Sequence, residues 1–323
     1  LLLSVVNVLW AATMTVTVVR RYVWILVAYI SGMGLMYAMA RAAGPSGGAA
    51  DLVLALAAGY ALATLFLVGA SLSALGHKSL PKMGALLLDY AWRYKNLALA
   101  GLLYSIATWA DKIVLALHSG SAAQGSHFLV NPRYDSAFFY ANLALIPGLV
   151  FFTIVTETEF SLNLKHLVVS LAKRRLPEIA AASRRIRYRS ASNLALQSGF
   201  QVAMIFGFAL AAPYLSGELD FEATVFIRIL VSGFFQLAFL TGLTILFYLE
   251  LYKRAAIAAF AFATLDLLLS VANVAAGSEA YLGLPYLISI ALASALCLAF
   301  AFTGLRSFDQ ILFLRATGEA YGR

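Results

Sequence analysis

Two charged residues, Asp111 and Lys112, stand side by side in the apolar stretch GLLYSIATWADKIVLAL (101–117). A charge at the centre of a bilayer costs roughly 2.5–3.5 kcal/mol, so such residues are retained where they pair or line a wet path. Asp266 and Arg228 stand in two other apolar stretches. These residue types fit two roles: ion pairs that fix helix packing, or a polar layer in a substrate pathway, with a protonatable Asp266.

Helix geometry predicts that the four charges share one depth. At 1.5 Å per residue, Asp111 lies roughly 22 Å from the cytoplasmic start of its helix and Asp266 roughly 16–20 Å from the start of its own. Arg228 lies roughly 9 Å below the opposite surface of a core about 30 Å thick. We therefore expect Asp111, Lys112, Arg228 and Asp266 to line or gate a path in the outer half of the membrane.

Three further features of the sequence bear on such a path. Pro147 and Gly148 predict a break in a helix, which is either a packing kink or a hinge. Glu157 and Glu159 mark the cytoplasmic end of the same helix, as an interfacial cap or as the end of the path. Aromatic side chains in these stretches either stack on sugar rings or pack within the bundle.

The elements that must position these residues are membrane-spanning helices. Of the 323 residues, 62% are hydrophobic and 12% are charged, whereas soluble domains carry about 25% charged residues. Nine segments are long and apolar enough to span a bilayer: 1–19, 22–43, 52–75, 96–117, 137–157, 193–213, 222–249, 255–276 and 281–304. The composition predicts an all-α polytopic membrane protein.

The distribution of basic residues predicts the orientation of the helices. With Arg41 at the end of the second segment counted to the connection that follows it, the numbers of Lys and Arg after the nine segments are 2, 1, 4, 1, 8, 0, 2, 0 and 3. Rich and poor connections alternate, and the rich ones belong in the cytoplasm. We therefore expect a cytoplasmic C-terminus and a first helix that runs inward. If the full chain begins in the cytoplasm, an odd number of spans precedes residue 1, and three would make twelve.

The long cytoplasmic connections predict the domain organisation. Residues 1–75 form three helices, 76–95 form a linker, 96–305 form a second bundle, and 306–323 form a cytoplasmic tail. Within the second bundle, 161–192 is a basic loop in which Pro177 would start a second short helix. Its Leu164, Leu167, Val168 and Leu171 share one helical face. The segment is either an interfacial helix or docking surface for a cytoplasmic partner, or a solvated loop that touches anionic lipid. Its basic residues are Lys173, Arg174, Arg175, Arg184, Arg185, Arg187 and Arg189.

Several classes of function find no support in the sequence. The net charge of +8 is explained by the cytoplasmic loops, and no basic soluble domain is present for nucleic acid. Catalytic signatures such as Walker, G-x-S-x-G or H-E-x-x-H motifs are absent, so we expect no enzyme and no cofactor. His118 and His127 lack further clustered ligands, so no metal site is expected.

Two strings of sequence carry a resemblance to a known family. NLALAGLLYSIATWADKIV (96–114) and FFYANLALIPGLVFFTIVTETEF (138–160) hold a Tyr–Trp–Asp–Lys run, a Pro–Gly pair and an acidic end, and FDQILFLR (308–315) follows near the C-terminus. With these motifs the chain resembles the Pel exopolysaccharide exporter family, the G component of the Pel secretion system of Gram-negative bacteria. That family falls within the multidrug/oligosaccharidyl-lipid/polysaccharide flippase superfamily.

The resemblance implies a fold, a function and partners. It implies about twelve helices in two six-helix bundles around a central cavity, of which residues 1–75 would complete the first bundle. It implies export of a nascent, N-acetylgalactosamine-rich polysaccharide across the bacterial inner membrane for the biofilm matrix. The implied partners are a cytoplasmic glycosyltransferase that uses a UDP-sugar, a cyclic-di-GMP receptor subunit and a membrane scaffold subunit, besides the polysaccharide substrate and the lipid bilayer.

Two alternatives to a polysaccharide translocator remain open from the sequence. One is a membrane scaffold that docks and activates the cytoplasmic synthase without forming the path. The other is a proton-coupled exporter of small molecules. A scaffold should tolerate Asp266→Asn, and a transporter that uses this carboxylate should not.

Overall fold

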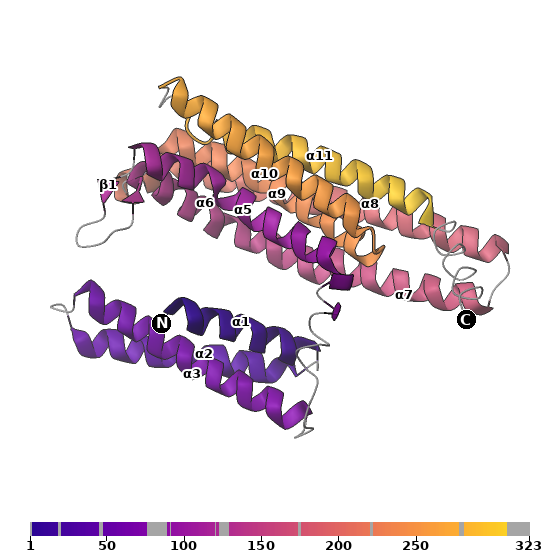
Figure 1. Ribbon diagram of the computed structural model, residues 1–323, viewed down its shortest axis with the longest axis horizontal. Helices are drawn as coiled ribbons and strands as arrows, with labels where there is room; N and C mark the ends of the chain where they lie inside the picture. The colour runs from indigo at the N-terminus through magenta and orange to yellow at the C-terminus, as the bar shows by residue number, and fades with distance from the viewer. Residues whose placement is uncertain are drawn as a thin grey trace. The chain divides into compact units, whose positions relative to one another are not determined.

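Helices of membrane-spanning length dominate both units of the chain, Leu1–Leu86 and Leu87–Arg323. The computed structural model describes residues 2–18, 21–44, 48–75, 89–90, 92–119, 121–122, 129–173, 176–219, 222–277 and 281–308. Within these residues, eight helices are long and apolar enough to cross a membrane. The 17-residue α1 (Leu2–Val18) covers the first of the nine expected segments. The chain is an all-α polytopic membrane protein (Figure 1).

The first unit packs three helices through small residues. It consists of α1, α2 (Tyr22–Ala43) and α3 (Ala49–Leu75). Gly32 of α2 meets Gly59 of α3 so closely that a Cβ on either one would lie 2.6 Å from the carbonyl oxygen of the other. Small residues allow this approach, which is how membrane helices gain van der Waals contact without a hydrophobic driving force.

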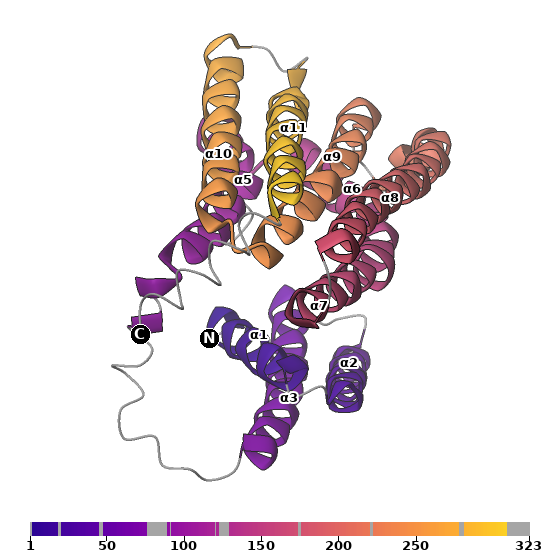
Figure 2. The ribbon, with the colours of Figure 1, turned by 90° about the vertical axis from the view of Figure 1, so that its right-hand side faces the viewer.

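The second unit contains the remaining described helices. They are α5 (Lys95–Ser119), α6 (Pro132–Phe151), the π-helix η1 (Phe152–Glu157), α7 (Thr158–Lys173), α8 (Leu176–Leu219), α9 (Ala223–Tyr248), α10 (Tyr252–Ala275) and α11 (Leu284–Arg306). Two two-residue strands, β1 (Ser121–Ala122) and β2 (Leu129–Val130), pair antiparallel between α5 and α6. Figure 2 shows α10 against α5, α11 between α10 and α9, and α8 beside α6.

The contact between α5 and α10 is the most extensive in the unit, and it is built on alanine. Ala107 of α5 and Ala259 of α10 are fully buried, so the two backbones come close enough for a side chain of one helix to reach the backbone of the other. Aromatic rings fill the space behind them. Phe262 stands 5.8 Å from Tyr286 of α11 and 5.6 Å from Phe239 of α9, measured between ring centroids.

The predicted helix break at Pro147 and Gly148 is wrong in position. Helix α6 continues through both residues to Phe151, and the departure from α geometry follows at η1, where the backbone is π-helical. π-Helical turns are rare and often occur at functional sites. A Cβ at Gly148 would overlap the ends of the Gln201 and Leu237 side chains, so a larger residue there requires these side chains to shift.

The predicted basic loop and its second short helix also differ from the structure. Residues 161–173 lie in α7, and α8 starts at Leu176, beside Pro177, but runs for 44 residues to the end of the next expected span. Leu164 and Leu167 of α7 are buried, as is Ile186 of α8, and the two helices pack on each other. Apolar contacts of this kind supply the tertiary support that extends the expected short helices into the longer α7 and α8.

Candidate functional site

Asp111 and Asp266 meet inside the second unit. Asp111 of α5 is 2% exposed and Asp266 of α10 is 0% exposed. The backbone N–H of Asp111 donates to Oδ2 of Asp266 at 3.1 Å. On the other side, the hydroxyl of Ser289 in α11 lies 3.0 Å from Oδ1 of Asp266. Thus three helices converge on a single buried carboxyl group.

Lys112 is the cation of this cluster. Its Nζ lies 3.7 Å from Oδ1 of Asp111 and donates to the carbonyl of Thr108. It also lies 3.3 Å from the ring centroid of Phe138, a cation–π contact. The hydroxyl of Tyr134, at the start of α6, donates to Oδ2 of Asp111. Residues of α6 thus contact both members of the ion pair: Tyr134 contacts Asp111, and Phe138 contacts Lys112.

Arg228, the fourth expected member of the charged layer, is bonded elsewhere. It is half-buried on α9, and its Nη1 donates to the carbonyl of Leu282 at 2.8 Å. Leu282 stands in the connection between α10 and α11, next to Gly283. The sequence places Arg228 with the carboxylates by depth, and in the structure its guanidinium donates to this connection.

An open cavity of about 530 Å³ lies beside Lys112, between α5, α6 and α9. Its wall combines aromatic rings with polar groups; it consists of Tyr104, Thr108, Trp109, Lys112, Asp135, Phe138, Phe139, Asn142 and Gln236. Ligand pockets typically enclose about 300–1,000 Å³ and place a few polar groups among apolar ones. The combination suits a ligand that has hydroxyl or amide groups on its edge and flat C–H faces, such as a pyranose.

A hydrogen-bonded chain supports the back of the cavity. Gln236 donates to the hydroxyl of Tyr104 at 3.0 Å, and its Oε1 accepts from the hydroxyl of Tyr286 at 3.3 Å. The ring of Tyr104 stacks on Phe239 with centroids 5.8 Å apart. These contacts hold the polar edge of Tyr104 toward the cavity in a fixed orientation.

A second polar region follows the buried face of α8. Asn193, Gln197 and Gln201, at helical spacing, are all less than 8% exposed. Gln197 accepts from Thr156 of η1 at 2.9 Å and from Thr241 of α9 at 3.1 Å. Both amide atoms of Gln201 are buried without a hydrogen-bond partner in the structure. A polar stripe thus connects the π-helix to the bundle interior.

Glu157 and Glu159, which the sequence predicts to mark the cytoplasmic end of a path, lie at one end of this stripe. Glu159 accepts from Asn193 at 2.8 Å and pairs with Arg189 at 3.6 Å. Glu157 is half-exposed and lines a narrow hollow between η1, α7, α8 and α9, together with Arg189. Thus Glu159 is held by Asn193 and Arg189, whereas Glu157 faces the hollow.

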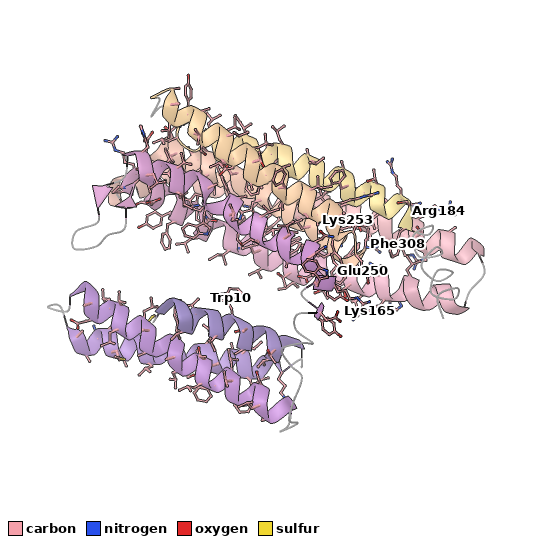
Figure 3. The ribbon with its side chains drawn as sticks, viewed as in Figure 1. Trp10, Lys165, Arg184, Glu250, Lys253 and Phe308 are labelled. Carbon is pink, nitrogen blue, oxygen red and sulfur yellow. The ribbon has the colours of Figure 1, made fainter. Side chains whose placement is uncertain are left out.

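The structure describes only some of the basic residues of the expected partner surface. Arg184, Arg185 and Arg189 are exposed on α8, and Arg187 is half-buried, with its Nη1 3.3 Å from Ser183. Arg174, Arg175 and the side chain of Lys173 lie outside the described residues, as do the expected tail from 309 onward and most of the 76–95 linker. Figure 3 shows Arg184, Lys165 and Lys253 toward the same end of the second unit.

A comparison with known families decides the family of the chain. Residues 1–313 match the family PelG, described as "Putative exopolysaccharide Exporter (EPS-E)". The chain belongs to the PelG family. No curated protein and no solved structure matches it. The match covers both units, so this PelG-family chain carries the buried Asp111–Asp266 cluster and the open cavity within an exporter.

Sequence reasoning missed several polar residues of the PelG-family chain. Tyr134, Gln236 and Ser289 hold the cluster and the cavity. Gln236 and Ser289 are each a single polar residue in an apolar stretch, and Tyr134 stands in the polar run NPRYDS (131–136) before its span. A signal did exist for α8: Asn193, Gln197 and Gln201 recur every four residues, which places them on one helical face. For Tyr134 and Ser289 the sequence holds no such signal, because their partners lie on other helices.

Proposed function

We propose that this chain forms the translocation path for a nascent, N-acetylgalactosamine-rich exopolysaccharide across the bacterial inner membrane, with its C-terminus in the cytoplasm. One observation carries the proposal: the open cavity of about 530 Å³ joins aromatic rings to amide, hydroxyl and charged groups. The match to an exopolysaccharide exporter family supports a sugar polymer as the ligand.

The wall of the cavity suits an N-acetylated sugar. Trp109 and Phe139 are 60% and 59% exposed, so their rings are free to stack on pyranose faces. Asn142 and Gln236 offer amides that pair with an acetamido group. Lys112 adds an ammonium that donates to hydroxyl or carbonyl oxygens. Transport requires weak, repeated contacts of this type, because a polymer must both enter and leave.

In this proposal the charged cluster controls the path. Asp111, Lys112 and Asp266 form a gate beside the cavity, Arg228 fixes the α10–α11 connection at its outer side, and Glu157 and Glu159 mark the cytoplasmic end. The basic side chains near the ends of α7, α8 and α10 support this orientation, because Lys and Arg are retained in the cytoplasm. We also assign this surface to the glycosyltransferase, cyclic-di-GMP receptor and scaffold subunits.

A scaffold that activates the synthase is the second candidate. Exposed Arg184, Arg185 and Arg189 favour it, because they present a basic surface to a cytoplasmic partner. The two candidates differ in where the polymer accumulates when the protein is lost. A missing path leaves polymer trapped inside, and a missing activator leaves no polymer.

The first experiment therefore deletes the full-length protein in its host and follows labelled UDP-sugar into polymer inside and outside the inner membrane. Polymer trapped inside supports translocation. Absence of polymer would favour the scaffold or a synthase that stalls without its exit.

The same assay in point variants separates these two cases. Phe139→Ala and Trp109→Ala should lower export roughly threefold to tenfold, since an aromatic contact contributes about 0.5–1.5 kcal/mol. Phe260→Ala is the matched control, because Phe260 of α10 is also 59% exposed and does not line the cavity. Equal export by all three variants would contradict the proposed path.

A further inference from the structure

Both oxygens of the buried Asp266 carboxyl group are in contact with hydrogen-bonding groups. Oδ2 accepts from the backbone N–H of Asp111 at 3.1 Å. Oδ1 lies 3.0 Å from the hydroxyl oxygen of Ser289. Asp266 is 0% exposed, so its ionisation state must be compatible with these contacts rather than with water.

The hydroxyl of Ser289 has one hydrogen and two acceptors within reach. Its oxygen lies 3.0 Å from Oδ1 of Asp266 and 2.9 Å from the carbonyl oxygen of Tyr286. An ionised Asp266 offers no hydrogen, so the two oxygens would compete for the one that Ser289 has. A protonated Asp266 completes both contacts: Oδ1–H donates to Ser289, and Ser289 donates to the carbonyl of Tyr286.

The charges on the neighbouring α5 favour the same state. Asp111 and Lys112 form an ion pair with Nζ and Oδ1 3.7 Å apart, and the side chains of both are nearly buried, at 3% and 12% exposure. The ammonium of Lys112 thus already balances the carboxylate of Asp111. A second carboxylate at Asp266 would add a negative charge directly behind this pair.

Other elements face this region with further titratable or charged groups. From α6, the hydroxyl of Tyr134 donates to Asp111, and Asp135 accepts from the backbone N–H of Asn131 at 2.9 Å. From α9, Arg228 donates to the carbonyl of Leu282. From α11, the hydroxyl of Tyr286 donates to Gln236.

A small hollow near Asp266 lies between α5, α6, α10 and α11. The hollow is lined by Ser270, Asn273, Asp111 and Tyr134, among others. Ser270, one turn after Asp266, is 2% exposed, and its hydroxyl has no hydrogen-bond partner in the structure.

We propose that Asp266 is a proton-binding site of this protein: it is a carboxylic acid that donates to Ser289 while Asp111 stays ionised beside Lys112. The proton reaches or leaves Oδ1 without any other covalent change. Because Lys112 also lines the cavity, a saccharide that draws its ammonium away from Asp111 strengthens the negative field at Asp266 and promotes proton uptake. This last coupling rests on the proposed function; the proton site does not.

The test is infrared difference spectroscopy of the full-length protein in lipid vesicles at neutral pH. The wild type should show the C=O stretching band of a protonated carboxyl group that Asp266→Asn loses and Asp111→Asn retains. Asn is close in shape to a protonated Asp, so the first variant should also fold. A spectrum of Asp266→Asn that keeps every such band would overturn the proposal, as would a band that disappears only in Asp111→Asn.

Ser289→Ala keeps the test decisive if Asp266→Asn does not fold. Removing the hydroxyl weakens the hydrogen bond from Oδ1–H, so the band should shift to higher frequency; an unchanged spectrum contradicts the assignment. Saturating sodium should leave the Asp266 band in place. Loss of this band in sodium would mean that a metal cation occupies the site instead of a proton.

A separate measurement tests whether a saccharide in the cavity changes the protonation of Asp266. An N-acetylhexosamine trisaccharide added to the wild-type vesicles should extend the band to higher pH, and Phe139→Ala should reduce this extension. If the trisaccharide binds without moving the band, the coupling is wrong. If the trisaccharide does not bind at all, the proposed function fails, while the Asp266 band still reports the proton site.

Discussion

The backbone N–H of Asp111 donates to the side chain of Asp266 across the α5–α10 contact, and the two residues lie 155 positions apart in the chain. This bond places one carboxyl group against the backbone that carries the other. Alanines on both helices make the approach possible. Lys112, the residue after Asp111, lies on the wall of the cavity, so the buried cluster and the cavity are neighbours on α5.

Removing the cation from this cluster should destabilise the second unit. Lys112→Met leaves the carboxylate of Asp111 buried without its ion pair, which typically costs about 3–5 kcal/mol. Thermal unfolding of the full-length protein in detergent measures the loss. Lys253→Met, at an exposed lysine of α10, should change stability by no more than about 0.5 kcal/mol. The double variant Asp111→Asn with Lys112→Met should recover most of the loss, and failure to recover would argue against an ion pair.

Two glutamines on α8 should respond in opposite ways to leucine. Gln201→Leu removes an amide that has no hydrogen-bond partner in the structure, so stability should be unchanged or rise by about 1–3 kcal/mol. Gln197→Leu removes the acceptor for Thr156 and Thr241 and should cost about 1–3 kcal/mol. The pair of variants is compared by thermal unfolding. A large loss in Gln201→Leu would show that this amide binds something essential.

Gly242 of α9 should tolerate no side chain while Cys297 faces it. A Cβ at this position would lie 2.8 Å from Sγ of Cys297 in α11. Overpacking of this kind costs about 1–3 kcal/mol, so Gly242→Ala should lower the unfolding temperature. Gly207→Ala on α8, where a Cβ meets nothing within 4 Å, is the control. Adding Cys297→Ala to Gly242→Ala should restore part of the loss; additive losses would refute the steric cause.

The first unit should depend on the glycine contact between α2 and α3. Gly32→Ala and Gly59→Ala should each cost about 1–3 kcal/mol, because each Cβ meets the carbonyl of the other glycine. The two losses should not add, since one separation of the helices relieves both clashes. Gly34→Ala, two residues along α2, meets nothing within 4 Å and should be neutral or stabilising. Equal effects at Gly32 and Gly34 would rule out the close contact.

The helical segments could be predicted because hydrophobicity over about 20 residues is a local property. The expected segment 22–43 coincides with α2, and 222–249 lies within two residues of α9 at either end. In the basic segment 161–192, the helical face that holds Leu164 and Leu167 could be recognised, but the 44-residue length of α8 could not be predicted from the sequence. The helical structure of this segment depends on apolar residues such as Leu167 and Ile186, which are buried where α7 and α8 pack together.

Local hydrophobicity was enough to predict the class of protein, the approximate spans and the residues that cannot face lipid unpaired. Charge in an apolar stretch is costly at any rotation of its helix, so Asp111, Lys112 and Asp266 could be identified from the sequence. Only the tertiary structure decided their partners. Arg228 shares their expected depth but turns to Leu282, while Ser289, which no pattern marked, reaches Asp266. The physical reason is that depth follows from counting residues along a helix, whereas contact depends on how each helix rotates and packs against its neighbours.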